Sequence, residues 1–160
     1  MITVNVWEGH ASFVISAGGG MPETTVSWWP RYGDFAILDG EPYVMPYATE
    51  LRVEAGTDQK RYRIFTLNDV ADGVSGAREH VGLDLTAISS WWQQWQTGRY
   101  RLLDHNCCCT VMCGLIAGGA RQYTGLAGYE FTEPDGNFMT PNEVDPFCRA
   151  IIRGMEAANF

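Results

Sequence analysis

The longest apolar stretch of the chain runs from Cys107 to Ala117 and contains four of the five cysteines. Asn106 is a favourable N-cap and Gly118-Gly119 a natural stop, so the stretch is predicted to be a helix. A cysteine in the first helical turn lies at the positive end of the helix dipole, beside unpaired backbone N–H groups that favour the thiolate. The same N–H groups can hold the oxyanion of a tetrahedral intermediate. Cys107 is therefore a candidate nucleophile; buried helix packing is the alternative for it and for the other cysteines here.

The remaining segments mix strand and helix signals. Residues 2–6, 10–17, 24–29 and 61–67 are predicted strands, and a glycine turn at 18–20 pairs the second with the third, which brings His10 near residues late in the third. Apolar spacing predicts a helix over Asp84–Thr97, and Thr140-Pro141-Asn142-Glu143 predicts the start of a last helix that runs to about Ala158. Residues 30–56, between the third and fourth predicted strands, are expected to be irregular, apart from a short helix near Tyr47–Val53. The predicted class is α+β, a small antiparallel sheet packed against helices in one domain over residues 1–160.

Composition limits the classes of partner. The chain has 160 residues, of which 46% are hydrophobic and 19% charged, as in a single globular domain. Its net charge of −8 argues against binding nucleic acid or an anionic membrane surface. No apolar run approaches the length of a membrane span, and no basic region followed by an apolar one precedes the first strand. We therefore expect a protein that is cytoplasmic when synthesised, compatible with secretion by a system that reads no N-terminal signal, and needing no cofactor.

A thiolate nucleophile needs a base within hydrogen-bond reach, and histidine fills this role best near neutral pH. The chain offers His10, His80 and His105. His10 opens a strand after Gly9, whereas His80 lies in a turn-like region and His105 is two residues before Cys107. Spacing does not choose among them, and an exposed or structural role is the alternative for each.

Several short motifs follow one another in a meaningful order: Gly9-His10-Ala11-Ser12-Phe13, Ser27-Trp28-Trp29-Pro30, Tyr100 to Cys107 with Asn106-Cys107 at its end, and Thr140-Pro141-Asn142. Together they resemble the circularly permuted papain-like hydrolases, the NlpC-type branch in which histidine precedes cysteine and which includes lecithin–retinol acyltransferase-like proteins. The resemblance spans about Gly9 to Ala150. Bacterial members with this pattern resemble effectors delivered by type VI secretion.

The resemblance implies a permuted papain-like arrangement with Cys107 as nucleophile and His10 as general base. The third member of such a site usually lies on the strand after the histidine, which implies Ser27; Glu8 is a charged alternative. The position after the nucleophile is usually small or polar, and Cys108-Cys109 departs from that pattern.

The expected function is a cysteine-dependent amide hydrolase that forms a covalent acyl-enzyme. Its substrate would be a peptide, peptidoglycan or a protein, including deamidation of a glutamine. An acyltransferase or thioesterase uses the same two residues and differs in the acceptor or the bond cleaved, and a non-enzymatic binding module is the other class. An effector of this kind would have an immunity protein or secretion-machinery protein as partner.

Two other uses of the same residues compete with these. Cysteines beside His105 could hold zinc, but three consecutive side chains on a helix point about 100° apart and do not converge, so no metal is expected. The tryptophans at 28–29 and at 91, 92 and 95 could line a carbohydrate or lipid pocket, although large aromatic residues are more often core. Adjacent tryptophans suggest that one of each pair is partly exposed.

Overall fold

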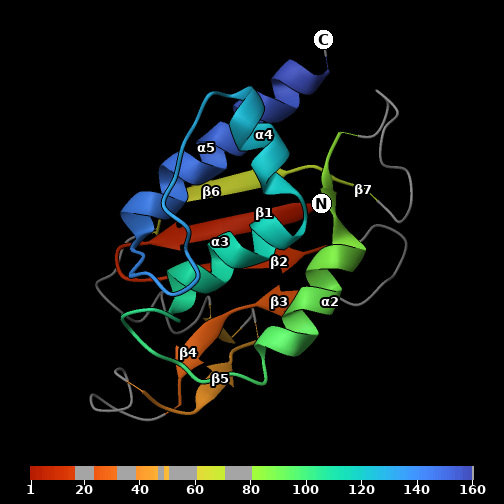
Figure 1. The fold of residues 1–160 in the computed structure, drawn as a ribbon. Coiled ribbons are helices and arrows are strands. Elements are labelled where there is room, and N and C mark those ends of the chain that lie inside the picture. Colours follow the sequence, from red (N-terminus) through yellow and green to blue (C-terminus); the bar gives the residue numbers. More distant parts are fainter. Residues whose placement is uncertain (17–23, 32–38, 47–48, 51–60, 71–80, 160) are drawn as a thin grey trace.

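The computed structural model of the chain describes residues 1–16, 24–31, 39–46, 49–50, 61–70 and 81–159. Its centre is a four-stranded antiparallel sheet with the strand order β3-β2-β1-β6 (Figure 1). The strands are β1 (Ile2–Trp7), β2 (Ala11–Ile15), β3 (Thr24–Val26) and β6 (Arg61–Leu67). This sheet together with four helices confirms the predicted α+β class, and the pairing of β2 with β3 confirms the predicted hairpin.

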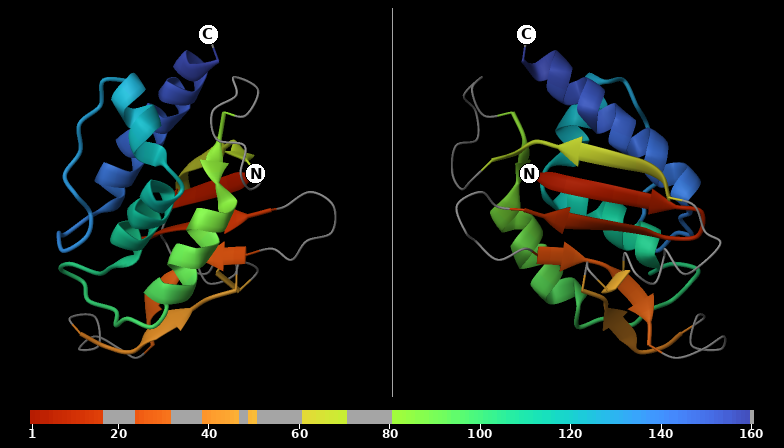
Figure 2. Two further views of the ribbon diagram at one scale, coloured as in Figure 1. Left: turned by 45° about the vertical axis from the view of Figure 1, so that its right-hand side comes forward. Right: turned by 180° about the vertical axis from the view of Figure 1, so that it is seen from behind.

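The helices are α2 (Leu85–Trp95), α3 (Cys107–Ala117), α4 (Ala120–Leu126) and α5 (Pro141–Ala158). Seen from behind, the strands lie in front of α3, α4 and α5, so these helices cover one face of the sheet (Figure 2). α3 packs against β2, while α5 packs against β1 and β6. The core lies between these layers and includes Val4, Phe13, Leu115 and Phe147, each fully buried.

Two smaller sheets lie beside this core. β4 (Trp28–Pro30) pairs antiparallel with β5 (Pro42–Val44), and β7 (Asp69–Val70) pairs parallel with β8 (Leu83–Asp84). The predicted strand over 24–29 is therefore divided, because β3 and β4 belong to different sheets. Ser27 lies at this division, where the chain leaves the central sheet.

Local signals explain the helix ends. The Asn106 side chain accepts from the Cys109 N–H, so α3 begins at Cys107 as predicted. The Thr140 and Glu143 capping box starts α5, which ends at Ala158 as predicted. α2 ends two residues before the predicted Thr97. The sequence analysis did not predict α4, β5, β7 or β8.

Gly114 permits the close approach of α3 to its neighbours. A methyl group at this position would lie 2.8 Å from the Trp91 ring and 2.9 Å from the Phe13 ring. Such distances are too short for a carbon contact, so any larger residue would push α3 away from β2 and α2. The glycine therefore lets α3 lie close to β2, the strand that follows His10.

Some sequence predictions lie outside the described residues, namely the glycine turn at 18–20 and most of the short helix near Tyr47–Val53. None of the helices in the described part of the chain is both long and apolar enough to cross a membrane.

Candidate active site

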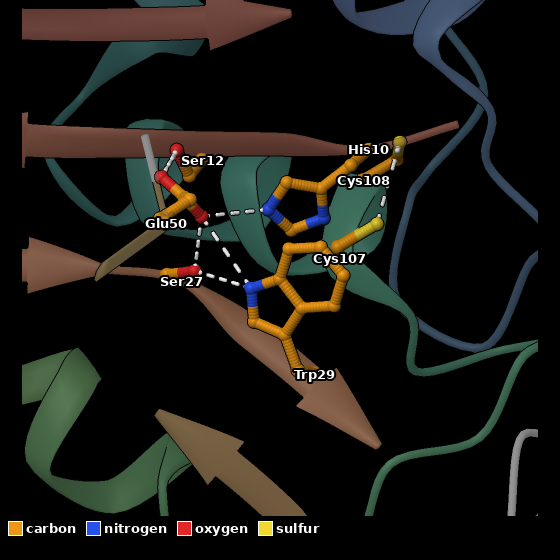
Figure 3. A network of polar contacts seen from close by, with 7 residues as sticks. All are labelled: His10, Ser12, Ser27, Trp29, Glu50, Cys107 and Cys108. Atoms are coloured by element: carbon orange, nitrogen blue, oxygen red, sulfur yellow. Dashed lines mark hydrogen bonds and ion pairs between the residues drawn. The ribbon is translucent and has the colours of Figure 1, made fainter. Parts of the chain in front are cut away.

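Cys107 and His10, far apart in the sequence, meet at one end of the central sheet (Figure 3). Cys107 is the first residue of α3, and His10 immediately precedes β2, against which α3 packs. The Cys107 sulfur faces the His10 imidazole, close enough for their charges and hydrogen bonding to shift each other's pKa, and the Ala11 N–H acts on the same sulfur. Both side chains are nearly buried, with 6% of Cys107 and 3% of His10 exposed. The fold therefore brings together the two residues on which the sequence analysis based its site.

A third residue, Glu50, completes the constellation. Its Oε1 lies 2.8 Å from His10 Nε2, and the whole residue is 0% exposed. Because Nε2 faces Glu50, the other ring nitrogen, Nδ1, faces Cys107 (Figure 3). The order carboxylate, imidazole, thiol is the arrangement in which an acid orients a base and the base activates a nucleophile.

Glu50 reaches the histidine from the side of the sheet opposite to α3. Ala11 and Phe13 of β2 face the helices, so Ser12 between them faces the other way. Ser12 Oγ donates to Glu50 Oε2 at 2.6 Å, and Ser27 Oγ donates to Glu50 Oε1. His10, at the end of the strand, can therefore contact a helix residue with one nitrogen and a residue of the opposite face with the other.

Tryptophan rings hold the imidazole in place. The Trp29 ring lies 4.0 Å from the His10 ring between centroids at an interplanar angle of 30°, and the Trp7 ring lies at 5.4 Å. Trp29 Nε1 also donates to Ser27 Oγ at 2.7 Å. Trp29 thus packs on the His10 ring. It also bonds to the Ser27 hydroxyl, which in turn donates to Glu50.

Opposing influences act on the pKa of His10. Burial lowers it, but the charge and hydrogen bonds of Cys107 and Glu50 outweigh burial and raise the pKa of His10 to about 9. Burial alone would raise the pKa of Glu50; its bonds from His10, Ser12 and Ser27 hold that pKa below the usual value. At neutral pH His10 is therefore an imidazolium and Glu50 a carboxylate.

The thiols fall into two groups. The hydrogen bond between the Cys107 and Cys108 sulfurs lowers the pKa of Cys107, burial opposes it, and His10 and the Ala11 N–H lower it further, to well below its ordinary value. Burial raises the pKa of Cys109 to about 11 and that of Cys113 to about 12. Cys107 is therefore a thiolate paired with an imidazolium, while those two thiols remain protonated.

The start of α3 offers donors to a developing negative charge. The Cys109 N–H is used by the Asn106 cap, but the N–H groups of Cys107 and Cys108 have no acceptor among the described residues. Asn106 Nδ2 donates to the carbonyl oxygens of Leu102, at 2.9 Å, and Met139, at 2.8 Å. Asn106 thus joins two loops to the helix start and leaves two N–H groups for an oxyanion.

The other predicted site residues lie elsewhere. Ser27, the implied third member, bonds to Glu50, and no contact between its hydroxyl and the imidazole is found among the described residues. Glu8 is exposed. His105 stacks on Trp95 with ring centroids 3.8 Å apart, and burial lowers its pKa. His80 lies outside the described residues.

The competing uses of cysteine and tryptophan can also be compared with the structure. All five cysteines are free thiols, and no group of three or more potential metal ligands occurs in the described part of the chain. Trp28 and Trp92 are buried while their neighbours Trp29 and Trp91 are partly exposed, which confirms the expectation for adjacent tryptophans.

Sequence reasoning missed Glu50. The residue belongs to a stretch without periodicity, forty positions from the histidine that it contacts. The one available signal was a carboxylate within the largely apolar run from Met45 to Leu51. That signal does not identify a partner.

Comparison with known proteins gives one match. The family model of the IcsB middle domain matches residues 45–159, which include Glu50 and Cys107 but not His10. IcsB is a secreted effector of Shigella. Searches of curated proteins and of solved structures found no match. Because the family model covers more than half of the chain, the protein belongs to the IcsB middle domain family.

Proposed function

We propose that the protein is a cysteine-dependent enzyme that cleaves an amide through a covalent acyl-enzyme, with Cys107 as nucleophile, His10 as acid and base, and Glu50 as the residue that orients His10. The observation that carries the proposal is the buried chain from Glu50 Oε1 through His10 to the Cys107 sulfur. A buried charged network of this kind is costly unless each member is paired, and perturbed pKa values are concentrated at functional sites. The permuted papain-like arrangement, which the resemblance implies, is part of this proposal.

The chemical steps follow from the protonation states. The Cys107 thiolate attacks the substrate carbonyl carbon, and the resulting oxyanion is held by the N–H groups of Cys107 and Cys108. His10 Nδ1–H gives its proton to the leaving amine as the carbon–nitrogen bond breaks. The neutral imidazole then takes a proton from water, which attacks the thioester. The acid is released, and Cys107 and His10 return as thiolate and imidazolium.

Acyl transfer is the second candidate, and a particular surface feature favours it. Leu103 is 61% exposed and Phe138 is 52% exposed. They adjoin Leu102 and Met139, whose carbonyl oxygens Asn106 binds beside the nucleophile. Exposed apolar side chains on both of these loops suit a substrate with an apolar acyl group. An acyl-enzyme that reacts with an amine in place of water would then complete a transfer.

The proposal is tested with a model ester, p-nitrophenyl acetate, and with amines as alternative acceptors. Wild-type protein should release p-nitrophenol, and peptide mass spectrometry should find the acetyl group on Cys107. Cys107→Ala and His10→Ala should lose both signals, while Cys113→Ala, which removes a buried thiol from the same helix, should keep them. Faster decay of the acyl-enzyme with added amine would favour transfer, and decay independent of amine would favour hydrolysis.

Equal reaction of wild-type and Cys107→Ala protein with the ester would overturn the proposal. Acetylation spread over several cysteines, with no preference for Cys107, would do the same.

We also infer that the enzyme acts as a secreted effector, and membership of the IcsB middle domain family supports this inference. Expression of the wild-type protein inside cells of the kind that the effector enters should then slow their growth. The Cys107→Ala variant should relieve this effect. Equal impairment by both forms would contradict an effector that acts by catalysis.

A further inference from the structure

The Cys107 thiolate has a close neighbour that the proposed mechanism does not use. Cys108 Sγ lies 4.0 Å from Cys107 Sγ, and Cys108 is only 2% exposed (Figure 3). The two residues are consecutive at the start of α3, so their backbone positions are fixed by the Asn106 cap. A sulfur–sulfur distance of 4.0 Å is within reach of an S–H hydrogen bond, which is weak to a neutral acceptor and stronger to an anion.

The surroundings decide which sulfur carries the proton. The imidazolium of His10 and the Ala11 N–H both contact Cys107. Cys108 has instead the carboxylate of Glu143 among its electrostatic neighbours, and burial adds to the cost of ionising it. Two sulfurs at this distance do not both ionise, because like charges repel strongly in a buried site. The proton therefore stays on Cys108, and Cys108 is the donor.

We propose that Cys108 is a thiolate-stabilising residue: its S–H donates to the Cys107 thiolate and so keeps the nucleophile ionised below neutral pH. This inference rests on the proposed role of Cys107. The donor contributes while the sulfur is negative, which is before attack and again when the thiolate leaves the acyl-enzyme. Once Cys107 forms a thioester its charge is gone, and the contact weakens.

A substitution of Cys108 leaves the other titratable groups near the two sulfurs in the chain. They come from the segment before β2, from the loop before α3, from α3 and from α5: His10, Tyr100, Cys109 and Glu143. Glu50 bonds to the ring nitrogen of His10 that faces away from Cys107. A change in the titration of Cys107 in a Cys108 variant can therefore be assigned to the lost donor, provided that α3 keeps its position.

The test is the rate of alkylation of Cys107 by iodoacetamide between pH 4 and pH 10, with tandem mass spectrometry placing the label. Cys108→Ala should raise the pH at which Cys107 becomes reactive by about one unit, so that its rate at acidic pH falls about tenfold. Above that pH the rate should equal or exceed that of the wild type, because a thiolate that accepts fewer hydrogen bonds is more nucleophilic. Misfolding would not produce this crossover.

Two further variants keep the test decisive. Cys108→Ser retains a hydroxyl donor, so its profile should lie between those of the wild type and Cys108→Ala; it is also the variant to measure if the alanine protein does not fold. Cys113→Ala removes a buried thiol further along the same helix and should leave the profile unchanged. A wild-type profile in Cys108→Ala would overturn the role of Cys108 while leaving Cys107 as nucleophile. Absence of any selective low-pH reactivity in wild-type protein would instead overturn the proposed function.

Discussion

Two histidine rings of this protein, His10 buried and His105 half-buried, both pack on a tryptophan ring but have opposite electrostatics. His10 packs on Trp29 with ring centroids 4.0 Å apart, and His105 packs on Trp95 at 3.8 Å. Burial lowers the pKa of both, yet the pKa of His10 is raised to about 9 while that of His105 is lowered. The difference is that His10 has partners.

Those partners lie on both sides of the His10 ring. Glu50 bonds to Nε2 and Cys107 faces the other nitrogen, whereas His105 Nε2 is buried without a hydrogen-bond partner among the described residues. An aromatic clamp therefore fixes a ring in either place, but only a flanking carboxylate and thiolate make it an imidazolium. The comparison separates a structural histidine from one suited to catalysis.

Replacing each histidine in turn should give the largest contrast. His10→Ala should lower the rate of ester cleavage by about 10²-fold to 10⁴-fold, because it removes the acid and base. His105→Ala should leave that rate within about twofold and lower the free energy of unfolding by about 1 kcal/mol, through lost ring packing. Steady-state kinetics and urea denaturation measure the two effects. A comparable loss of rate in both variants would contradict the distinction between them.

Glu50→Gln should lower the pKa of His10 and so bring it closer to that of His105. Without the carboxylate the imidazolium is less stable, so the rate should fall roughly tenfold to a hundredfold at pH 8. Cleavage of an amide needs His10 protonated so that the amine can leave, and wild-type turnover of an amide substrate should therefore fall as pH rises through about 9. In Glu50→Gln this decline should begin at lower pH. A decline at the same pH in both proteins would remove Glu50 from the site.

Ser27→Ala tests whether the serine acts directly or through Glu50. It removes one donor from the carboxylate, which should cost about 1.5 kcal/mol of unfolding free energy and less than about fivefold in rate. Ser12→Ala removes the donor to the other oxygen and is the matched control. Similar effects in both would support an indirect role. A loss as large as that of Glu50→Gln from Ser27→Ala alone would restore the serine as the third member.

The smallest effect concerns stability at acidic pH. Because the folded pKa of His105 is below its unfolded value of 6.5, the unfolded chain binds the proton more readily. Stability is therefore lost as pH falls below 6.5, and His105→Gln should lose less than the wild type between pH 7 and pH 5. Urea midpoints at the two pH values measure this difference. An identical decline in the two proteins would mean that His105 is not shielded from protonation.

The parts of the fold that could be predicted depend on local signals. α3 and α5 have the predicted ends because Asn106 and the Thr140 capping box act within one turn. The division of the 24–29 strand at Ser27 was missed, because apolar content alone does not reveal a change of sheet. α4 has no side-chain cap at Gly119 and only seven residues, so it left no comparable signal.

The site was predictable only in part for the same reason. Cys107 is marked by its place after an N-cap, and His10 by its motif before a strand. Glu50 belongs to a stretch of sequence without periodicity, and the tertiary fold brings this residue to His10. Its identification therefore needed the three-dimensional arrangement. The resemblance implied Ser27 instead, whose hydroxyl bonds to Glu50 and is linked to His10 through that carboxylate.

The most direct test of the central claim is an NMR titration of His10 in protein with isotope-labelled histidine. The ion pair predicts that the ring stays protonated through neutral pH and loses its proton at about pH 9. In Cys107→Ala the transition should move to lower pH, because the negative sulfur is gone. A His10 ring that is already neutral at pH 7 in the wild type would contradict the thiolate–imidazolium pair on which the proposed mechanism rests.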